Sequence, residues 1–74
     1  MPPDTSLLET AKNRWATIVG RATALHSEPV DVVNGVLKIA VHTPAWSHQL
    51  AFLEREICDA LPGVERLRFV GGRR

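Results

Sequence analysis

Basic side chains in the second half of the chain have the type and spacing to contact phosphate groups. Arg66 and Arg68 are two residues apart in a segment that alternates basic and apolar residues, so both side chains share one face of an extended strand. Contacts between basic side chains and phosphates gain affinity by releasing counterions. No aromatic residue lies beside these side chains on that face to stack on a base, so the pattern predicts weak, sequence-independent binding. The alternative is a solvated charged surface. The predicted nucleic-acid-binding residues are Lys38, Arg66, Arg68, Arg73 and Arg74.

Two aromatic residues are candidates for a protein contact. Trp46 lies on the apolar stripe of a predicted helix, where core packing is the ordinary role, but its place in the first turn also suits an interface anchor. Phe52 lies about 240° round the same helix, on a polar face that also carries Arg55. A phenylalanine there is either a lone exposed apolar group or the centre of a contact. We predict a partner-binding site of Trp46, Phe52 and Arg55.

No residue pattern in the sequence is typical of catalysis or of metal binding. His42 and His48 do not have the spacing of a metal-ligand pair. Cys58 has no recognisable base beside it, and packing is its expected role. The sequence contains no phosphate loop and no nucleophile elbow. We therefore expect no catalytic residues, no metal, no cofactor and no enzyme activity.

Length and composition are typical of one small globular domain spanning residues 1–74. Of its 74 residues, 45% are hydrophobic and 23% charged, and the formal net charge is only +1. The single cysteine cannot form an internal disulfide, which suits a reducing compartment. The N-terminus lacks the basic and apolar regions of a secretion signal, and no apolar run approaches the ~20 residues of a membrane span. We expect a cytoplasmic protein that does not enter the membrane.

Two amphipathic helices are predicted to support the sheet that carries these residues. The first runs from about residue 5, with Ser6 and Glu9 as a capping box, and Gly20 ends or kinks it. One further helical turn is expected within 21–26. The second helix runs from an N-cap at Thr43 to about residue 61.

A β-hairpin between the helices has the strongest local signal. The dipeptide Asn34-Gly35 tolerates the positive φ angles that a type I′ turn requires. A two-residue loop fixes the register of strands 29–33 and 36–42. It predicts the apolar pairs Val32 with Leu37 and Val30 with Ile39, and a charge pair of Asp31 with Lys38.

The complete order of elements predicts an α+β, two-layer fold. A last strand over 64–70 turns Leu67 and Phe69 inward and both of its arginines outward. Both long helices then cover the apolar face of a three-stranded sheet. The other face would carry Asp31, Lys38, Arg66 and Arg68, and the segments 1–4 and 71–74 would be flexible.

The same residues, taken in order, form a known pattern. They resemble the DciA-like family of bacterial proteins, long classed as a domain of unknown function, over residues 8–70. The matching positions are Trp15, Ile18-Val19-Gly20, His26, Pro29-Val30, Gly35-Val36-Leu37, Ala45-Trp46, Leu50 and Phe52-Leu53.

The resemblance implies a fold similar to the type II K-homology domain, of order α-β-β-α-β. It also implies a role in DNA replication, in which DciA-like proteins recruit or load the DnaB-type replicative helicase and bind DNA. The Gly-x-x-Gly clamp of K-homology domains is absent, because the segment 20–23 has only its first glycine. Members commonly carry a disordered extension that is not in this sequence.

We therefore expect a non-enzymatic adaptor that binds the replicative helicase and, weakly, DNA. One alternative is a K-homology-like RNA-binding module. Another is a protein-interaction or homodimerisation domain without a nucleic-acid role, in which Phe52 and an open sheet edge make the contacts.

Overall fold

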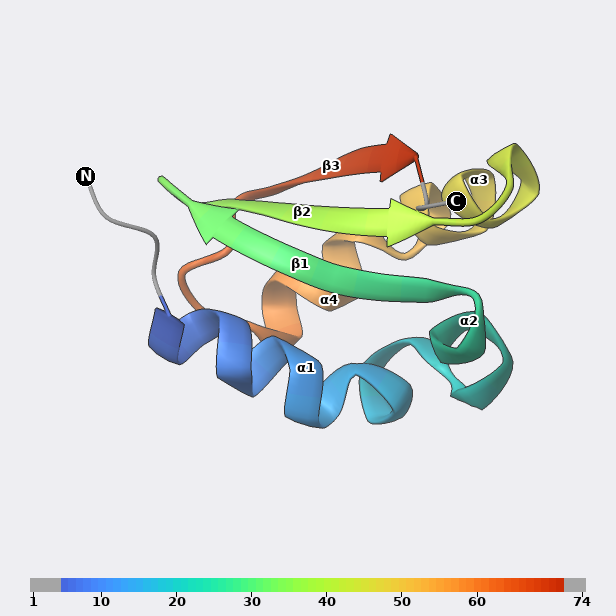
Figure 1. The fold of residues 1–74 in the computed structure, drawn as a ribbon. Coiled ribbons are helices and arrows are strands. Elements are labelled where there is room, and N and C mark those ends of the chain that lie inside the picture. The colour runs from blue at the N-terminus through green and yellow to red at the C-terminus, as the bar shows by residue number, and fades with distance from the viewer. Residues whose placement is uncertain (1–4, 72–74) are drawn as a thin grey trace.

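The computed structural model describes residues 5–71. The predicted phosphate ligands Arg73 and Arg74, and the end segments 1–4 and 72–74, lie outside the described residues. Figure 1 shows the order of the elements along the chain. They are α1 (Thr5–Val19), α2 (Arg21–Leu25), β1 (Ser27–Val33), β2 (Val36–Val41), α3 (Pro44–Phe52), α4 (Glu54–Ala60) and β3 (Arg66–Gly71).

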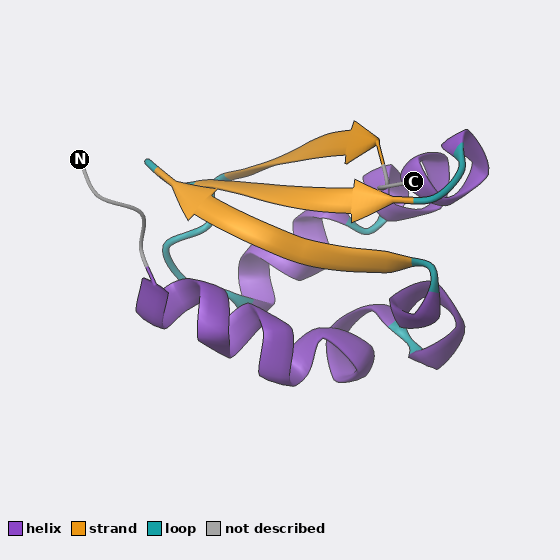
Figure 2. Ribbon diagram, viewed as in Figure 1, coloured by secondary structure: helices purple, strands orange, loops and turns teal. Residues whose placement is uncertain are grey.

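The fold has two layers, with the helices on one face of a three-stranded sheet (Figure 2). The strand order is β1-β2-β3; β1 and β2 are antiparallel, whereas β2 and β3 are parallel. The parallel pair is possible because α3 and α4 carry the chain back beneath the sheet. The predicted α+β class, the three strands and the helices on one face are confirmed.

The hairpin turn forms where the sequence predicts it. Asn34 and Gly35 have φ angles of 53° and 79°, and Asn34 is the only non-glycine residue with positive φ among the described residues. Next to the turn, Val32 opposes Leu37 and Asp31 opposes Lys38, as predicted.

The predicted pairing of Val30 with Ile39 is wrong. The register shifts between Pro29 and Asp31, so that Pro29 opposes Ile39 and Val30 is 40% exposed. Proline has no N–H to give to the strand ladder, and a bulge at this point accommodates the extra residue. The strand also begins at Ser27, two positions before the predicted start.

The predicted second helix is two helices. The chain leaves the helical conformation at Leu53, which has φ −94° and ψ 5°, and its N–H donates to the Leu50 carbonyl at 2.9 Å. No proline or glycine marks this position, so the break has no local sequence signal. Thr43 precedes the first of the two helices, but its side chain makes no capping hydrogen bond.

The core lies between the sheet and the helices. Trp15 is almost fully buried, and its indole N–H donates to the Ser27 hydroxyl at 3.0 Å; that hydroxyl in turn donates to the Thr23 carbonyl at 2.7 Å. This chain of hydrogen bonds satisfies the polar atoms that α1 and β1 bury. The apolar core residues are Ala11, Trp15, Val19, Val32, Leu37, Ile39, Val41, Leu50, Ile57, Leu61 and Val64.

Candidate nucleic-acid and partner-binding surfaces

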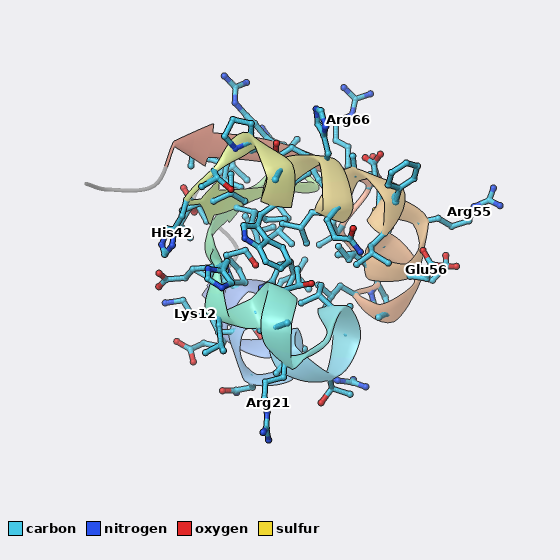
Figure 3. The ribbon with its side chains drawn as sticks, turned by 90° about the vertical axis from the view of Figure 1, so that its right-hand side faces the viewer. Lys12, Arg21, His42, Arg55, Glu56 and Arg66 are labelled. Carbon is cyan, nitrogen blue, oxygen red and sulfur yellow. The ribbon has the colours of Figure 1, made fainter. Side chains whose placement is uncertain are left out.

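The face of the sheet that no helix covers carries a row of charged side chains. Asp31 pairs with Lys38 across the hairpin, and Lys38 pairs with Arg68 across the parallel strands. Arg66 lies two positions before Arg68 on the same face, and in Figure 3 it projects from the sheet side, away from Arg21 on the helical side. We call Lys38, Arg66 and Arg68 the basic sheet face.

Exposure within the basic sheet face is uneven. Arg66 and Arg68 are exposed, whereas Lys38, on the central strand, is half-buried between its neighbours. The Asp31 carboxylate accepts a hydrogen bond from the Val32 N–H at 2.9 Å. Two free guanidinium groups two residues apart can each reach a phosphate, with the ammonium of Lys38 beside them.

Aromatic side chains are absent from this face of the described sheet. Trp15 and Trp46 lie on helices, Phe52 ends α3, and Phe69 turns toward the core. Stacking of bases is therefore unavailable here, and only charge can hold a nucleic acid.

Trp46 lies in an aromatic cluster that the sequence did not predict. Its ring stacks on His26 with centroids 4.8 Å apart and planes 8° apart, and His42 meets His26 edge to face at 6.3 Å. The three residues come from the α2–β1 junction, the end of β2 and the first turn of α3. They are far apart in sequence, so no spacing rule indicates the contact. One face of the half-buried indole is thus occupied within the chain.

Phe52 lies on the outer surface of the helical layer. It is 83% exposed and lines a shallow depression with His48 and Ala51. Arg55 is also exposed and projects outward in Figure 3. The structure does not bring Trp46 and Phe52 into one site, because Trp46 turns toward α2 while Phe52 faces solvent.

A second contact that the sequence did not predict joins α4 to β3. The Leu67 N–H donates to the Glu54 carboxylate at 3.3 Å, in an exposed position. Burial raises the pKa of the Cys58 thiol, and the carboxylates of Glu54 and Asp59 raise it further, which favours the neutral thiol.

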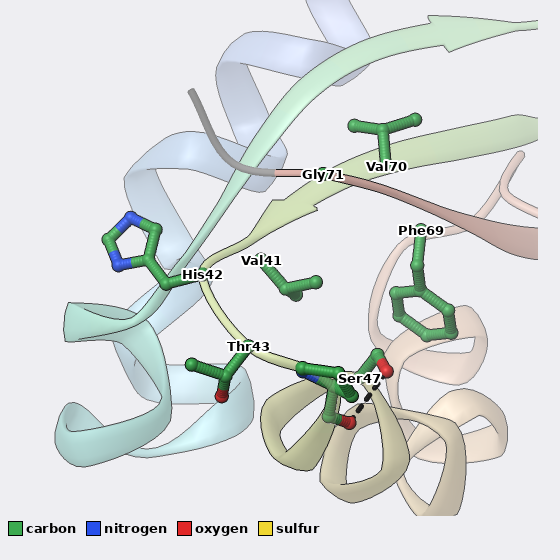
Figure 4. A pocket seen from close by; sticks show the side chains of 8 residues that line it. Val41, His42, Thr43, Ser47, Phe69, Val70 and Gly71 are labelled. Carbon is green, nitrogen blue, oxygen red and sulfur yellow. Dashed lines mark hydrogen bonds between the residues drawn. The ribbon is translucent and has the colours of Figure 1, made fainter. Parts of the chain in front are cut away.

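A hollow lies at the carboxyl ends of β2 and β3, above the start of α3 (Figure 4). The Phe69 ring points into it, while the His42 ring points away. The Ser47 hydroxyl donates to the Pro44 carbonyl at 2.8 Å, so it is already engaged. No acid, base and nucleophile meet there, and the hollow offers no catalytic arrangement among the residues that the structure places.

Two features are absent from the described part of the chain, namely a helix that could span a membrane and a cluster of metal ligands. None of its helices has the length and apolar character needed to cross a bilayer. Within residues 5–71, no group of three or more His, Cys, Asp or Glu side chains is placed to hold a metal ion.

Comparison with known proteins identifies the family. The family model described as "Dna[CI] antecedent, DciA" matches residues 6–64. A UPF0232 protein of Bifidobacterium longum is 35% identical over 54 residues, 73% of this chain, and one of Rhodococcus jostii is 33% identical over 68 residues, 84% of this chain. An uncharacterized protein of Treponema pallidum is 41% identical over 51 residues, 69% of this chain.

These relatives are much longer proteins. The aligned regions span only 35% to 36% of their lengths. The matched segment 6–64 contains α1 to α4 and the hairpin, and Arg66 and Arg68 follow directly after it. DciA is not a known family of enzymes. Because the family model covers most of the chain, the chain belongs to the DciA family.

Proposed function

We propose that this domain is a non-enzymatic adaptor in DNA replication, which binds the DnaB-type replicative helicase and weakly binds DNA in the cytoplasm. Membership of the DciA family is the observation that carries the proposal. An adaptor that positions two partners needs two binding surfaces and no reacting groups. The described residues offer a basic surface on the sheet and an apolar one around Phe52 on the helical layer.

DNA would bind the basic sheet face. Arg66 and Arg68 are exposed, and Lys38 lies beside Arg68 in the register. Three cations without aromatic neighbours hold the phosphate backbone through charge alone, so the affinity would be low and independent of base sequence. Arg73 and Arg74 would add to the same positive field from outside the described residues.

The helicase would bind the exposed end of α3 and the start of α4. Phe52 supplies a large apolar side chain that nothing in the described chain covers, and Arg55 supplies a charge beside it. An aromatic anchor with an arginine neighbour is a frequent centre of protein interfaces. Trp46 would contribute only the part of its ring that His26 leaves free.

Size-exclusion co-elution with the host's own DnaB-type helicase tests this assignment. We expect the wild-type domain to co-elute and Phe52→Ala to reduce the affinity about tenfold or more, as loss of an interface anchor does. Leu25→Ala is the matched control, because Leu25 is also a large apolar residue, 71% exposed, but lies on α2.

Three results would contradict the proposal. The first is an unchanged affinity of Phe52→Ala for the helicase. The second is no co-elution of the wild-type domain at any concentration. The third is binding of single-stranded RNA in clear preference to DNA, which would favour a K-homology-like RNA-binding module. The sequence argues against that module, because none of its five glycines lies three positions from another.

A further inference from the structure

The two edges of the sheet differ in their protection against a further strand. Edge strands commonly avoid unwanted pairing through proline, bulges or covering elements. β1 has Pro29 and a bulge at Val30, and α1 packs beside it. β3 has six residues, Arg66–Gly71, without proline and without a register shift. By these criteria β3 is the open edge.

The amide groups at the open edge are arranged to bind a neighbouring strand. The Arg66 N–H points toward the β2 side of the strand and donates to the carbonyl of Gly35, the turn residue just before β2, at 3.2 Å. Because amides alternate along a strand, those of Leu67 and Phe69 point away from β2. Leu67 meets the Glu54 carboxylate, and no described side chain accepts from Phe69. The Glu54 carboxylate thus takes the position that a backbone carbonyl of a neighbouring strand would have.

The side chains along β3 indicate what such a strand would carry. Arg66 and Arg68 are exposed on the open face of the sheet, and Leu67 and Phe69 are half-buried on the helix side. Side chains of an added strand lie beside those of its neighbour on each face. Acidic residues would therefore lie next to the two arginines, and apolar residues next to Leu67 and Phe69.

A second copy of this chain does not fit the same edge. Pairing β3 with another β3 in antiparallel orientation would place the arginines of one copy beside those of the other. Like charges on neighbouring strands are destabilising. The charges of β3 thus disfavour a homodimer through this edge and favour a partner of opposite charge.

We propose that the edge of β3 is a docking site for an extended segment of a partner protein in which acidic and apolar residues alternate. The segment adds as a fourth strand, its main chain takes over the Leu67 N–H from Glu54, and its carboxylates pair with Arg66 and Arg68. The arginines are the same as those of the basic sheet face. The acidic segment and DNA consequently exclude each other, but the docking site itself does not depend on the proposed helicase role.

A synthetic peptide of alternating valine and glutamate, with blocked ends, is the direct probe. In amide-resolved NMR we expect saturable shifts confined to β3 and Glu54, and slower hydrogen exchange of the Phe69 amide. The control peptide has the same composition with its glutamates in one block. It should bind about tenfold more weakly, because it cannot present acids on one face and valines on the other.

Substitutions in the domain separate strand addition from simple charge attraction. Arg68→Glu should abolish binding of the valine-glutamate peptide and allow binding of the corresponding valine-lysine peptide. Arg14→Glu, an exposed substitution on α1, should change the affinity for neither peptide. Glu54→Ala should bind the peptide several-fold more tightly than wild type, because no carboxylate competes for the Leu67 N–H. Glu54→Gln, which keeps an acceptor oxygen, should lie between the two.

Several outcomes would overturn the docking site. These are equal binding of both peptides, peptide binding without protection of the Phe69 amide, and no binding at millimolar peptide. Protection of that amide by concentrating the protein alone would make a second copy the occupant instead. DNA binding that persists while the peptide fails would remove this docking site and leave the proposed function intact.

Discussion

At the scale of single residues, the two candidate partner aromatics have different environments. Trp46 is half-buried, packs against the core and stacks on His26. Phe52 is 83% exposed. An alanine substitution at Trp46 would therefore disturb the fold as well as the proposed partner contact, whereas one at Phe52 tests the proposed contact alone. Experiments on the partner surface should begin with Phe52.

This difference predicts opposite effects on stability. Trp46→Ala should lower the free energy of unfolding by about 1–3 kcal/mol, because it removes the stack on His26 and part of the core contact. Phe52→Ala should change it by less than about 0.5 kcal/mol, as is usual at exposed positions. Urea denaturation followed by circular dichroism measures both. Equal losses at the two positions would contradict the assigned environments.

At the scale of elements, the hairpin turn also holds β3 in place. The Gly35 carbonyl accepts the N–H of Glu65 at 2.7 Å and that of Arg66 at 3.2 Å. The turn thus joins the antiparallel hairpin to the parallel strand. Its geometry determines where the arginines of β3 lie relative to Lys38.

Gly35→Ala should destabilise the domain by about 1 kcal/mol or more, because φ is +79°, a backbone conformation that residues with a Cβ rarely adopt. Gly71→Ala is the matched control, since φ is not in the positive range there and a Cβ would meet open space. Thermal unfolding measures both changes. A neutral Gly35→Ala would show that the turn does not need a left-handed glycine.

At the scale of the whole molecule, the two layers carry the two proposed binding surfaces separately. The helical layer buries the core and presents Phe52, whereas the open face of the sheet presents Arg66 and Arg68. The net charge is only +1, so the proposed binding of DNA would depend on where the charges lie and not on their sum. A DNA strand on the sheet would leave the surface of α3 accessible.

The salt dependence of DNA binding tests this arrangement. If Lys38, Arg66 and Arg68 alone make the proposed phosphate contacts, a plot of log K against log salt should have a slope of about −2 to −3. Arg68→Ala should make the slope shallower by about one unit, and the exposed α1 substitution Arg14→Ala should not change it. Fluorescence anisotropy with a labelled oligonucleotide gives both values. Equal changes for the two variants would assign the binding to net charge alone.

Local sequence patterns suffice to predict the class of fold and which residues share most of its faces. The Asn34-Gly35 turn, the apolar stripe through Trp15 and the alternation of Arg66 and Arg68 are local patterns, and each is set by the geometry of a single helix, strand or turn. The exposure of Phe52 was predictable for the same reason, since helix periodicity alone places it opposite the core.

Features that depend on residues distant in sequence become visible only in the folded chain. The bulge at Val30 and the break at Leu53 are departures from the regular strand and helix that the sequence pattern predicts. Both occur where the element packs against its neighbours. The stack of His26 on Trp46 and the hydrogen bond from Leu67 to Glu54 join elements whose relative placement no local spacing encodes. Contacts of this kind form only after the chain has folded, so they have no local sequence signal.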